Sequence, residues 1–181
     1  PSRRYLPLIT HSVNPASGEL TRYELPVDLI TLPCPSILIK YTKVVIFMTM
    51  QKIVSYNVNG IRAAINKGLL AWMKEEKPGI LCIQETKAQP DQVDMDPFRK
   101  LGYTDYWHSA EKKGYSGVLI LTNREPDNIA IGMNLSDYDS EGRVIRMDMG
   151  NISFINVYIP SGTTGDVRQD FKMKFLDDFL N

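Results

Sequence analysis

The sequence has no excess of either charge, few cysteines and few histidines. Lysine and arginine together number 21, and aspartate and glutamate also number 21, so the formal charge is zero. A neutral chain is not expected to bind nucleic acid through net positive charge alone. It can still be an enzyme whose acidic site holds a cation, because the metal then supplies positive charge where a phosphate binds. Net charge therefore leaves the partner undecided.

The sequence also lacks a long apolar run. The longest candidate, residues 35–49, is shorter than the roughly 18–20 residues that span a bilayer and contains Lys40 and Lys43, so we expect no membrane segment. Only two cysteines occur, Cys34 and Cys82. Cys82 lies in an apolar run, where a free thiol behaves as a small hydrophobic group. We interpret it as a buried, inert thiol, which fits a reducing compartment and a cytoplasmic protein.

Residues 1–49 differ in composition from residues 50–181. Six of the 11 prolines fall in the N-terminal stretch, and proline at that density blocks helices and central strands. The stretch is either a real N-terminal extension or upstream sequence translated ahead of a start at Met48 or Met50. We favour the second explanation and assign no catalytic role to these residues. Residues 50–181 are then a separate domain.

From residue 52 onward the pattern of apolar residues becomes regular. Strands are expected at Ile53–Asn57 and at residues 80–84, joined by a helix over residues 62–76, which together form a parallel βαβ unit. Further strands are expected at residues 103–109, 117–122, 128–133, 143–149 and 152–159, with a tight hairpin at Gly150-Asn151 and a helix from Asp166. This order predicts an α/β fold with a mixed sheet covered by helices. The last helix carries an apolar face formed by Phe171, Phe175, Leu176 and Phe179. No strand comes after it in these residues, so we expect an interrupted architecture.

Polar side chains stand at the carboxyl ends of three expected strands. Asn57 ends the first strand, Glu85 follows the second, and Tyr158 lies near the end of the last, on the same face as Asn156. Ligands gather at such strand ends in open α/β sheets. Glu85 could be a Mg²⁺ ligand, with Asn57 orienting it or the attacking water, and Tyr158 could bond a phosphate oxygen. Alternatively, Asn57 belongs to an Asn-Gly turn, Glu85 is a solvated strand end, and Tyr158 is a rim aromatic.

Five short motifs, in order along the chain, resemble one known family. They are YNVNGIRA at residues 56–63, IQETK at 83–87, GYSGV at 114–118, EGRVI at 141–145 and NVYIP at 156–160. Together they are similar to the N-terminal half of the exonuclease III/AP endonuclease family, within the endonuclease/exonuclease/phosphatase superfamily. The resemblance implies a mixed-sheet four-layer α/β sandwich, truncated in these residues. It further implies a monomeric, metal-dependent enzyme that hydrolyses double-stranded DNA 5′ to abasic sites and trims 3′ ends. The implied cofactor is Mg²⁺, with Mn²⁺ as the alternative ion.

The resemblance also assigns roles to particular residues. Glu85 would be a metal ligand, with Asn57 beside it in the metal site and Asn59 next to both. Tyr158 would contact the scissile phosphate. Arg62, Tyr115 and Asn59 would form the DNA contacts, which would position the duplex without reading its sequence. Arg143 would have a structural, charge-pairing role.

Two departures from the family pattern affect the expected activity. The loop at residues 160–165 contains no arginine, and the next one is Arg168. The family's Gly-Asp-x-Asn motif and its C-terminal Asp-His pair do not occur in these 181 residues, and His108 matches no catalytic position. We therefore expect these residues alone not to nick an abasic duplex.

Three alternatives to this nuclease stay open. The first is a superfamily phosphatase acting on a small or lipid phosphate ester. The second is a DNA-binding module without nuclease activity, which the 16 basic against 18 acidic residues of 50–181 disfavour. The third is a non-catalytic fragment that does not fold stably alone.

Overall fold

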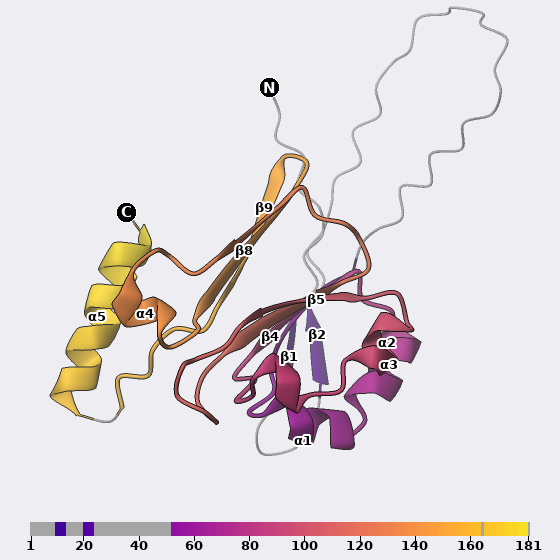
Figure 1. Ribbon diagram of the computed structural model, residues 1–181, viewed down its shortest axis with the longest axis horizontal. Coiled ribbons are helices and arrows are strands. Elements are labelled where there is room, and N and C mark those ends of the chain that lie inside the picture. The colour runs from indigo at the N-terminus through magenta and orange to yellow at the C-terminus, as the bar shows by residue number, and fades with distance from the viewer. Residues whose placement is uncertain (1–9, 14–19, 24–51, 164, 181) are drawn as a thin grey trace, which may run out of the picture.

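The computed structural model describes residues 10–13, 20–23, 52–163 and 165–180 (Figure 1). In the proline-rich N-terminal region, β1 (Thr10–Val13) and β2 (Leu20–Tyr23) pair as antiparallel strands. Proline composition alone gave no reason to expect these strands. Both strands are proline-free, which explains why the density of prolines around them does not block pairing.

A four-stranded mixed sheet forms the centre of the molecule. Its order is β3 (Ile53–Asn57), β4 (Ile80–Gln84), β6 (Val118–Thr122) and β5 (Thr104–His108). β3 and β4 are parallel, and the other pairs are antiparallel, as the order of strands and helices predicts. β4 and β6 consist almost entirely of buried apolar residues because layers cover both faces of the sheet.

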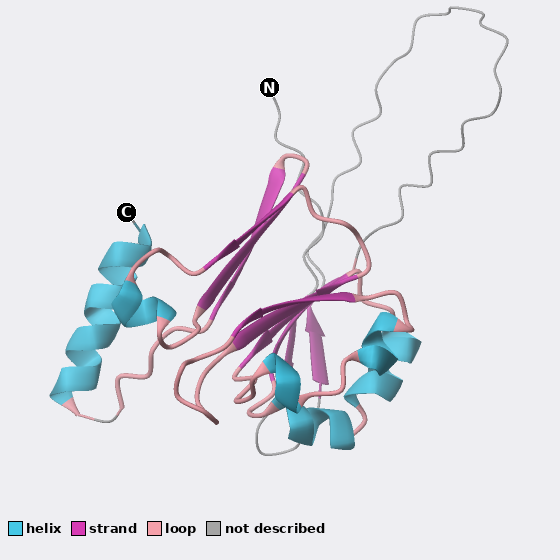
Figure 2. Ribbon diagram, viewed as in Figure 1, coloured by secondary structure: helices cyan, strands magenta, loops and turns pink. Residues whose placement is uncertain are grey.

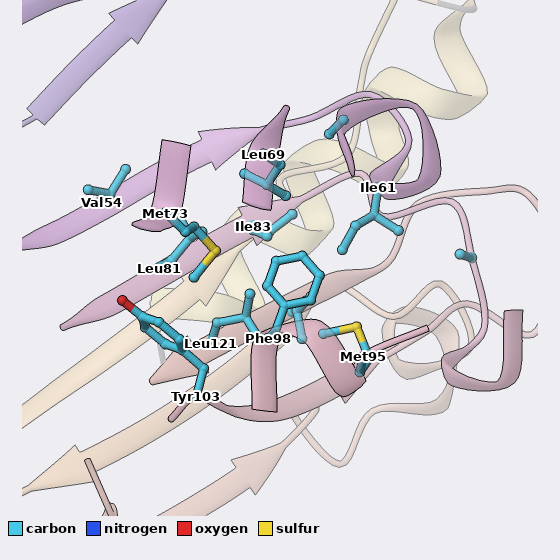
Figure 3. Close-up of a cluster of buried hydrophobic side chains, with 13 residues drawn as sticks. Val54, Ile61, Leu69, Met73, Leu81, Ile83, Met95, Phe98, Tyr103 and Leu121 are labelled. Carbon is cyan, nitrogen blue, oxygen red and sulfur yellow. The ribbon is translucent and has the colours of Figure 1, made fainter. Parts of the chain in front are cut away.

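Helices cover one face of this sheet (Figure 2). The single helix predicted over residues 62–76 is instead two, α1 (Ile61–Asn66) and α2 (Leu69–Glu76). Gly68 separates them with φ +102°, a left-handed conformation that cannot continue a right-handed helix. The 3₁₀ helix η1 (Pro90–Gln92) and α3 (Asp96–Arg99) follow β4. Figure 3 shows the core beneath these helices, in which Ile61, Leu69, Met73 and Phe98 pack on Val54, Leu81, Ile83 and Leu121.

A second, antiparallel sheet covers the other face of the first. It contains β7 (Asn128–Ile131), β8 (Val144–Met149) and β9 (Ile152–Val157), with the predicted hairpin between the last two. Ile145 and Met147 pack on Cys82 and Ile120 of the first sheet. The strands therefore divide between two sheets: the first is the mixed sheet that the strand order predicted, and the second completes the sandwich that the family resemblance implied.

The fourth layer is helical. α4 (Ser136–Asp139) and α5 (Asp166–Leu180) lie beside the second sheet, on the side away from α1 and α2 (Figure 1). Phe175 of α5 packs against Tyr138 and Val144. The layer order helix, sheet, sheet, helix confirms the predicted four-layer α/β sandwich. Within the described residues, no helix has both the length and the apolarity that crossing a membrane requires.

Cys82 is buried between the two sheets and is a free thiol. Burial raises the pKa of this thiol to about 12, because the interior disfavours the charged thiolate. A thiol that stays protonated is a poor nucleophile and a poor metal ligand. The prediction of a buried, inert cysteine is confirmed at this position. Cys34 lies outside the described residues.

Gly142 marks a close approach between two chain segments, and its replacement gives a stability test. Its φ is +61°, and a Cβ there would lie 2.5 Å from the main-chain N of Ala110 and 2.6 Å from the carbonyl O of His108. We expect Gly142→Ala to lower the free energy of unfolding by about 3 kcal/mol, since a left-handed backbone and a main-chain clash both contribute.

Gly150 provides the matched control for this test. Its φ is +60°, but a Cβ there would meet nothing within 4 Å. Gly150→Ala therefore isolates the backbone conformation, which costs about 1 kcal/mol. Urea unfolding followed by circular dichroism measures both variants. Equal losses would show that the approach at Gly142 imposes no steric demand.

Candidate active site

Asn57, Glu85 and Tyr158 meet at one edge of the molecule. Asn57 Nδ2 donates to Glu85 Oε1 at 2.8 Å. The Tyr158 phenol lies close enough to the Glu85 carboxylate for each group to shift the other's pKa, that of Glu85 downward and that of Tyr158 upward. Glu85 and Tyr158 are half-buried, whereas Asn57 is exposed. Asn57 and Tyr158, which come from two other expected strands, therefore lie beside the Glu85 carboxylate.

The local backbone explains how Glu85 reaches this position. β3 and β4 are parallel neighbours with Asn57 opposite Gln84, so their carboxyl ends lie together. Glu85, the first residue after β4, has φ +55°, which turns its side chain away from the strand direction. Its carbonyl accepts from Gly60 N at 2.7 Å, which links the loop after β4 to the start of α1. Left-handed non-glycine residues carry strain and gather at functional sites, and Asn59 and Lys87 nearby share this conformation.

The Glu85 carboxylate lies in a cationic, hydrogen-bonded environment. Lys87 Nζ lies 2.9 Å from Glu85 Oε2 and also donates to Asn59 Oδ1. Burial raises the pKa of Glu85, but hydrogen bonds from Asn57, Lys87 and Tyr158 outweigh it, so the pKa lies below its ordinary value. Burial and the neighbouring Glu85 carboxylate raise the pKa of Tyr158 to about 12. At neutral pH, Glu85 is thus a carboxylate and Tyr158 a protonated hydrogen-bond donor.

The donor set can be tested against a divalent cation. Mg²⁺ in proteins usually takes one or two carboxylates and completes its shell with water and substrate phosphates. Glu85 supplies one carboxylate, while the side-chain oxygen of Asn57 accepts from Asn59 N at 3.1 Å and its amide group faces Glu85. Among the described residues, no three His, Cys, Asp or Glu side chains form a metal-binding group. The residues therefore fit a Mg²⁺ site to which they supply one carboxylate ligand, Glu85, and the hydrogen bond from Asn57 orients that ligand.

A second cluster, formed by Arg143, Arg168, Glu141 and Tyr115, adjoins Tyr158. The buried Arg143 guanidinium donates to Glu141 Oε2 at 2.6 Å, to the Tyr158 carbonyl at 2.8 Å and to the Tyr115 hydroxyl at 3.1 Å. Arg168 Nη1, from the first turn of α5, donates to Glu141 Oε1 at 2.9 Å. Glu141 is therefore held by two guanidinium groups at once. The structure gives Arg143 the charge-pairing contacts that the resemblance implied.

The remaining expected DNA contacts lie on either side of these clusters. Tyr115 is half-buried within the arginine cluster, and its hydroxyl also accepts from Arg168 at 3.2 Å. Arg62 is exposed on α1, and Asn59 is exposed beside Glu85. A hollow of about 290 Å³ opens beside Asn59 and is lined in part by Tyr56, Lys67 and Trp72. His108 lies outside the site: its two ring nitrogens lie 2.9 Å from the Val144 carbonyl and 3.0 Å from the Asp139 carbonyl.

Lys87, Glu141 and Arg168 were not singled out as site residues from the sequence. Lys87 lies two positions after Glu85 in the IQETK motif, so that motif contained the available signal. Glu141 likewise lies within EGRVI. Arg168 is different: it reaches the site because α5 folds back against the second sheet, and no local pattern gives that contact.

The charge of Glu141 makes stability depend on pH. Burial raises its pKa, but hydrogen bonds from Arg168 and Arg143 outweigh burial, so the pKa lies below its ordinary value. A lowered carboxyl pKa stabilises the fold above the unfolded-state pKa of about 4.3, and that contribution is lost as pH falls through the lower folded-state value. We expect Glu141→Gln to be less stable than the parent chain at pH 7, with the difference shrinking below about pH 4. Urea midpoints between pH 3 and pH 7 test this, and Glu111→Gln, at an exposed position, is the control. A difference that stays constant across this range would contradict the assignment.

The four-layer α/β sandwich brings a carboxylate, a phenol and two arginines together at one edge of the molecule. The chain belongs to the endonuclease/exonuclease/phosphatase family, whose family model matches residues 54–180. It is 40% identical over 131 residues to an exodeoxyribonuclease of Bacillus subtilis. It is 37% identical over 127 residues to a DNA-(apurinic or apyrimidinic site) endonuclease of Dictyostelium discoideum. The predicted family resemblance is confirmed.

The solved structure of an AP endonuclease from Archaeoglobus fulgidus has the same fold, with a TM-score of 0.63 and 33% identity. That match covers 72% of this chain and 49% of the archaeal chain. The Bacillus subtilis match covers 72% of this chain and 51% of the relative, and the Dictyostelium match covers 70% and 35%. The chain thus spans about half the length, or less, of the relatives that it matches.

Proposed function

We propose that the protein is a DNA-repair phosphodiesterase that hydrolyses the DNA backbone 5′ to abasic sites and trims 3′ ends. The observation that carries this proposal is the Glu85 carboxylate directly after β4, which Asn57 and Lys87 hold and which the Tyr158 phenol adjoins. The names of the relatives, an exodeoxyribonuclease and an apurinic or apyrimidinic site endonuclease, support the choice of DNA as substrate. Residues 50–181 would form the N-terminal half of the catalytic domain, and residues 1–49 would lie outside it.

Each site residue has a task in this proposal. Glu85 would hold Mg²⁺ or Mn²⁺, with Asn57 orienting the carboxylate. When bound, the cation would stabilise negative charge on the phosphate during hydrolysis. Tyr158, protonated at neutral pH, would donate a hydrogen bond to a phosphate oxygen. Lys87 keeps an ammonium group beside the same carboxylate and would add positive charge there.

The proposed DNA contacts extend to both sides of Glu85. Arg62 on α1 and Asn59 would contact the backbone on one side, and Tyr115 on the other. Such contacts position a duplex without reading its sequence. We propose that the protein acts as a monomer in the cytoplasm, and the free, buried thiol of Cys82 supports a reducing compartment.

Binding tests this proposal within these residues, whether or not they turn substrate over. We would titrate the ¹⁵N-labelled chain with Mn²⁺, and separately with a duplex containing an abasic-site analogue. We expect both ligands to perturb the amide signals of residues 57–62 and 85–87. Glu85→Gln should weaken the Mn²⁺ broadening at least about tenfold, because the carboxylate that the described residues bring to the site is neutralised.

The controls separate the proposed substrate from the alternative ones. Asp166→Asn, at an exposed position, should leave Mn²⁺ broadening near Glu85 unchanged. An undamaged duplex and a soluble inositol phosphate are titrated in parallel. Perturbation of the site by inositol phosphate but not by DNA would overturn the proposal in favour of a phosphatase. Perturbation by neither would overturn the assignment of a phosphate-ester site.

A further inference from the structure

Asn156 is a buried amide that joins the two sheets. It lies on β9, opposite Ile145 of β8, and its side chain is 1% exposed. Its Nδ2 group donates to the Ile83 carbonyl at 3.0 Å and to the Leu119 carbonyl at 2.9 Å. Its Oδ1 atom accepts from Gln84 Nε2 at 2.7 Å. Both N–H groups and the oxygen of the amide are therefore used across the interface between the sheets.

These bonds fasten one residue of the second sheet to three strands of the first. Ile83 lies on β4 and Leu119 lies opposite it on β6. Gln84 extends the connection to β3, because its Nε2 also lies 3.1 Å from Ser55 Oγ. Apolar contacts between the sheets are non-directional and do not fix a lateral position, whereas hydrogen bonds require a defined distance and angle. The amide therefore fixes how the second sheet is aligned on the first.

The hydrogen bonds of Asn156 lie directly beside the candidate active site. Gln84 immediately precedes Glu85 on the chain, and Asn156 lies two residues before Tyr158, so the side chains of Asn156 and Tyr158 point the same way. Tyr158 directly follows β9 of the second sheet and Glu85 directly follows β4 of the first, so the alignment of the two sheets sets the distance between these two side chains. Any shift of β9 along β4 would change that distance.

We propose that Asn156, together with Gln84, is a positioning residue that holds the Tyr158 phenol in register with the Glu85 carboxylate. The inference rests on the proposed function, because the placement of the Tyr158 phenol beside the Glu85 carboxylate matters only if both act at the phosphate-ester site. An amide suits this task because it offers two donors to two carbonyls and an acceptor to Gln84. A carboxylate would place an acceptor against the carbonyls, and an apolar side chain would leave both of them without this donor.

A thermodynamic cycle on Mn²⁺ affinity tests the proposal. The affinity is measured from amide broadening near Glu85 in the full chain. We expect Asn156→Ala and Tyr158→Phe each to weaken binding by about tenfold, as loss of a group that orients a metal ligand does. The double variant should bind no more weakly than either single variant, since both changes disturb the same contact.

Tyr138→Phe is the matched control, because it removes another hydrogen bond of a buried side chain, from Tyr138 to Asp178 at 2.6 Å, away from the site. It should lower thermal stability and leave Mn²⁺ affinity unchanged. If Asn156→Ala does not fold, Gln84→Met removes the connection to β3 while keeping the bonds of Asn156 to Ile83 and Leu119. This milder variant should weaken binding by about threefold, and by no further amount in the Tyr158→Phe background.

The outcomes distinguish the two proposals. Additive losses in the cycle, or a loss for Asn156→Ala no larger than for Tyr138→Phe, would overturn the positioning role while Glu85→Gln still weakens binding. Mn²⁺ affinity that does not respond to Glu85→Gln would instead overturn the proposed function.

Discussion

Arg143→Met should lower the free energy of unfolding by about 3 kcal/mol, at the low end of the range for breaking a buried ion pair. The Arg143 side chain is 1% exposed and pairs with Glu141 at 2.6 Å. Methionine keeps much of the volume and removes the charge and all the donors. Three acceptors then lose a partner: Glu141, the Tyr158 carbonyl and the Tyr115 hydroxyl. Glu141 retains Arg168, which limits the loss.

A second arginine on the same strand provides the control for this prediction. Arg146 also lies on β8 and pairs with Asp148 at 2.8 Å, but its side chain is 53% exposed. Water screens that pair, so Arg146→Met should change stability by less than about 1 kcal/mol. Urea unfolding of both variants at pH 7 gives the comparison. If the two losses are equal, burial does not determine the contribution of Arg143, and the charge-pairing role is wrong.

Arg143, which is expected to stabilise the fold, also contacts two tyrosines of the candidate active site. Its guanidinium lies 5.0 Å from the ring centroid of Tyr158 and 5.9 Å from that of Tyr115. The main chain of Tyr158 is bonded to Arg143 twice, through the Tyr158 carbonyl and through Tyr158 N, which donates to the Arg143 carbonyl at 2.9 Å. The position of the chain at the end of β9 thus depends on the Arg143 guanidinium, and that guanidinium is in turn held by the Glu141 carboxylate. Asn156 fixes β9 on one side of Tyr158, and Arg143 fixes the chain at Tyr158 itself.

The strands were predictable from the sequence because their signals are local. Ile53–Asn57 and Ile80–Gln84 were placed at their observed bounds, and the Gly150-Asn151 hairpin follows from its turn residues. The break at Gly68 was missed because the apolar spacing continues through it, and only the left-handed backbone reveals the stop. Division into two sheets could not be read from strand patterns, because a buried strand has the same composition whichever sheet it joins.

The site was predictable where strand ends determine it and not where distant segments meet. Asn57 and Glu85 were expected to be neighbours because parallel strands end together. Tyr158 was expected to join them because it lies near the end of the last expected strand, and the structure brings it beside Glu85 from the second sheet. The partnership of Arg168 with Glu141 spans 27 positions and depends on the docking of α5. The position of α5 is set by tertiary packing, and no short sequence motif predicts it.

Phe175→Ala should lower the free energy of unfolding by about 4 kcal/mol, as deletion of a buried aromatic ring does. Phe175 is fully buried, and its ring meets Tyr138 edge-on at 5.1 Å and stacks on Phe179 at 5.9 Å. It is the fully buried anchor among the described side chains of α5. Met173→Ala on the same helix changes a side chain that is 48% exposed, so it should cost less than about 1 kcal/mol.

Loss of this anchor should also affect the arginine cluster, since α5 carries Arg168. When the helix loosens, Arg168 leaves Glu141 and Tyr115, and Arg143 is then the remaining cation on the Glu141 carboxylate. Amide hydrogen exchange measures this directly: protection in α5 should fall in Phe175→Ala before that of β4 and β6 does, because helix opening needs less energy than global unfolding. In Met173→Ala the exchange pattern should match the parent chain. Equal loss of protection in α5 and in the central strands would mean that the helix does not open separately, and that Arg168 stays in place until the whole fold unfolds.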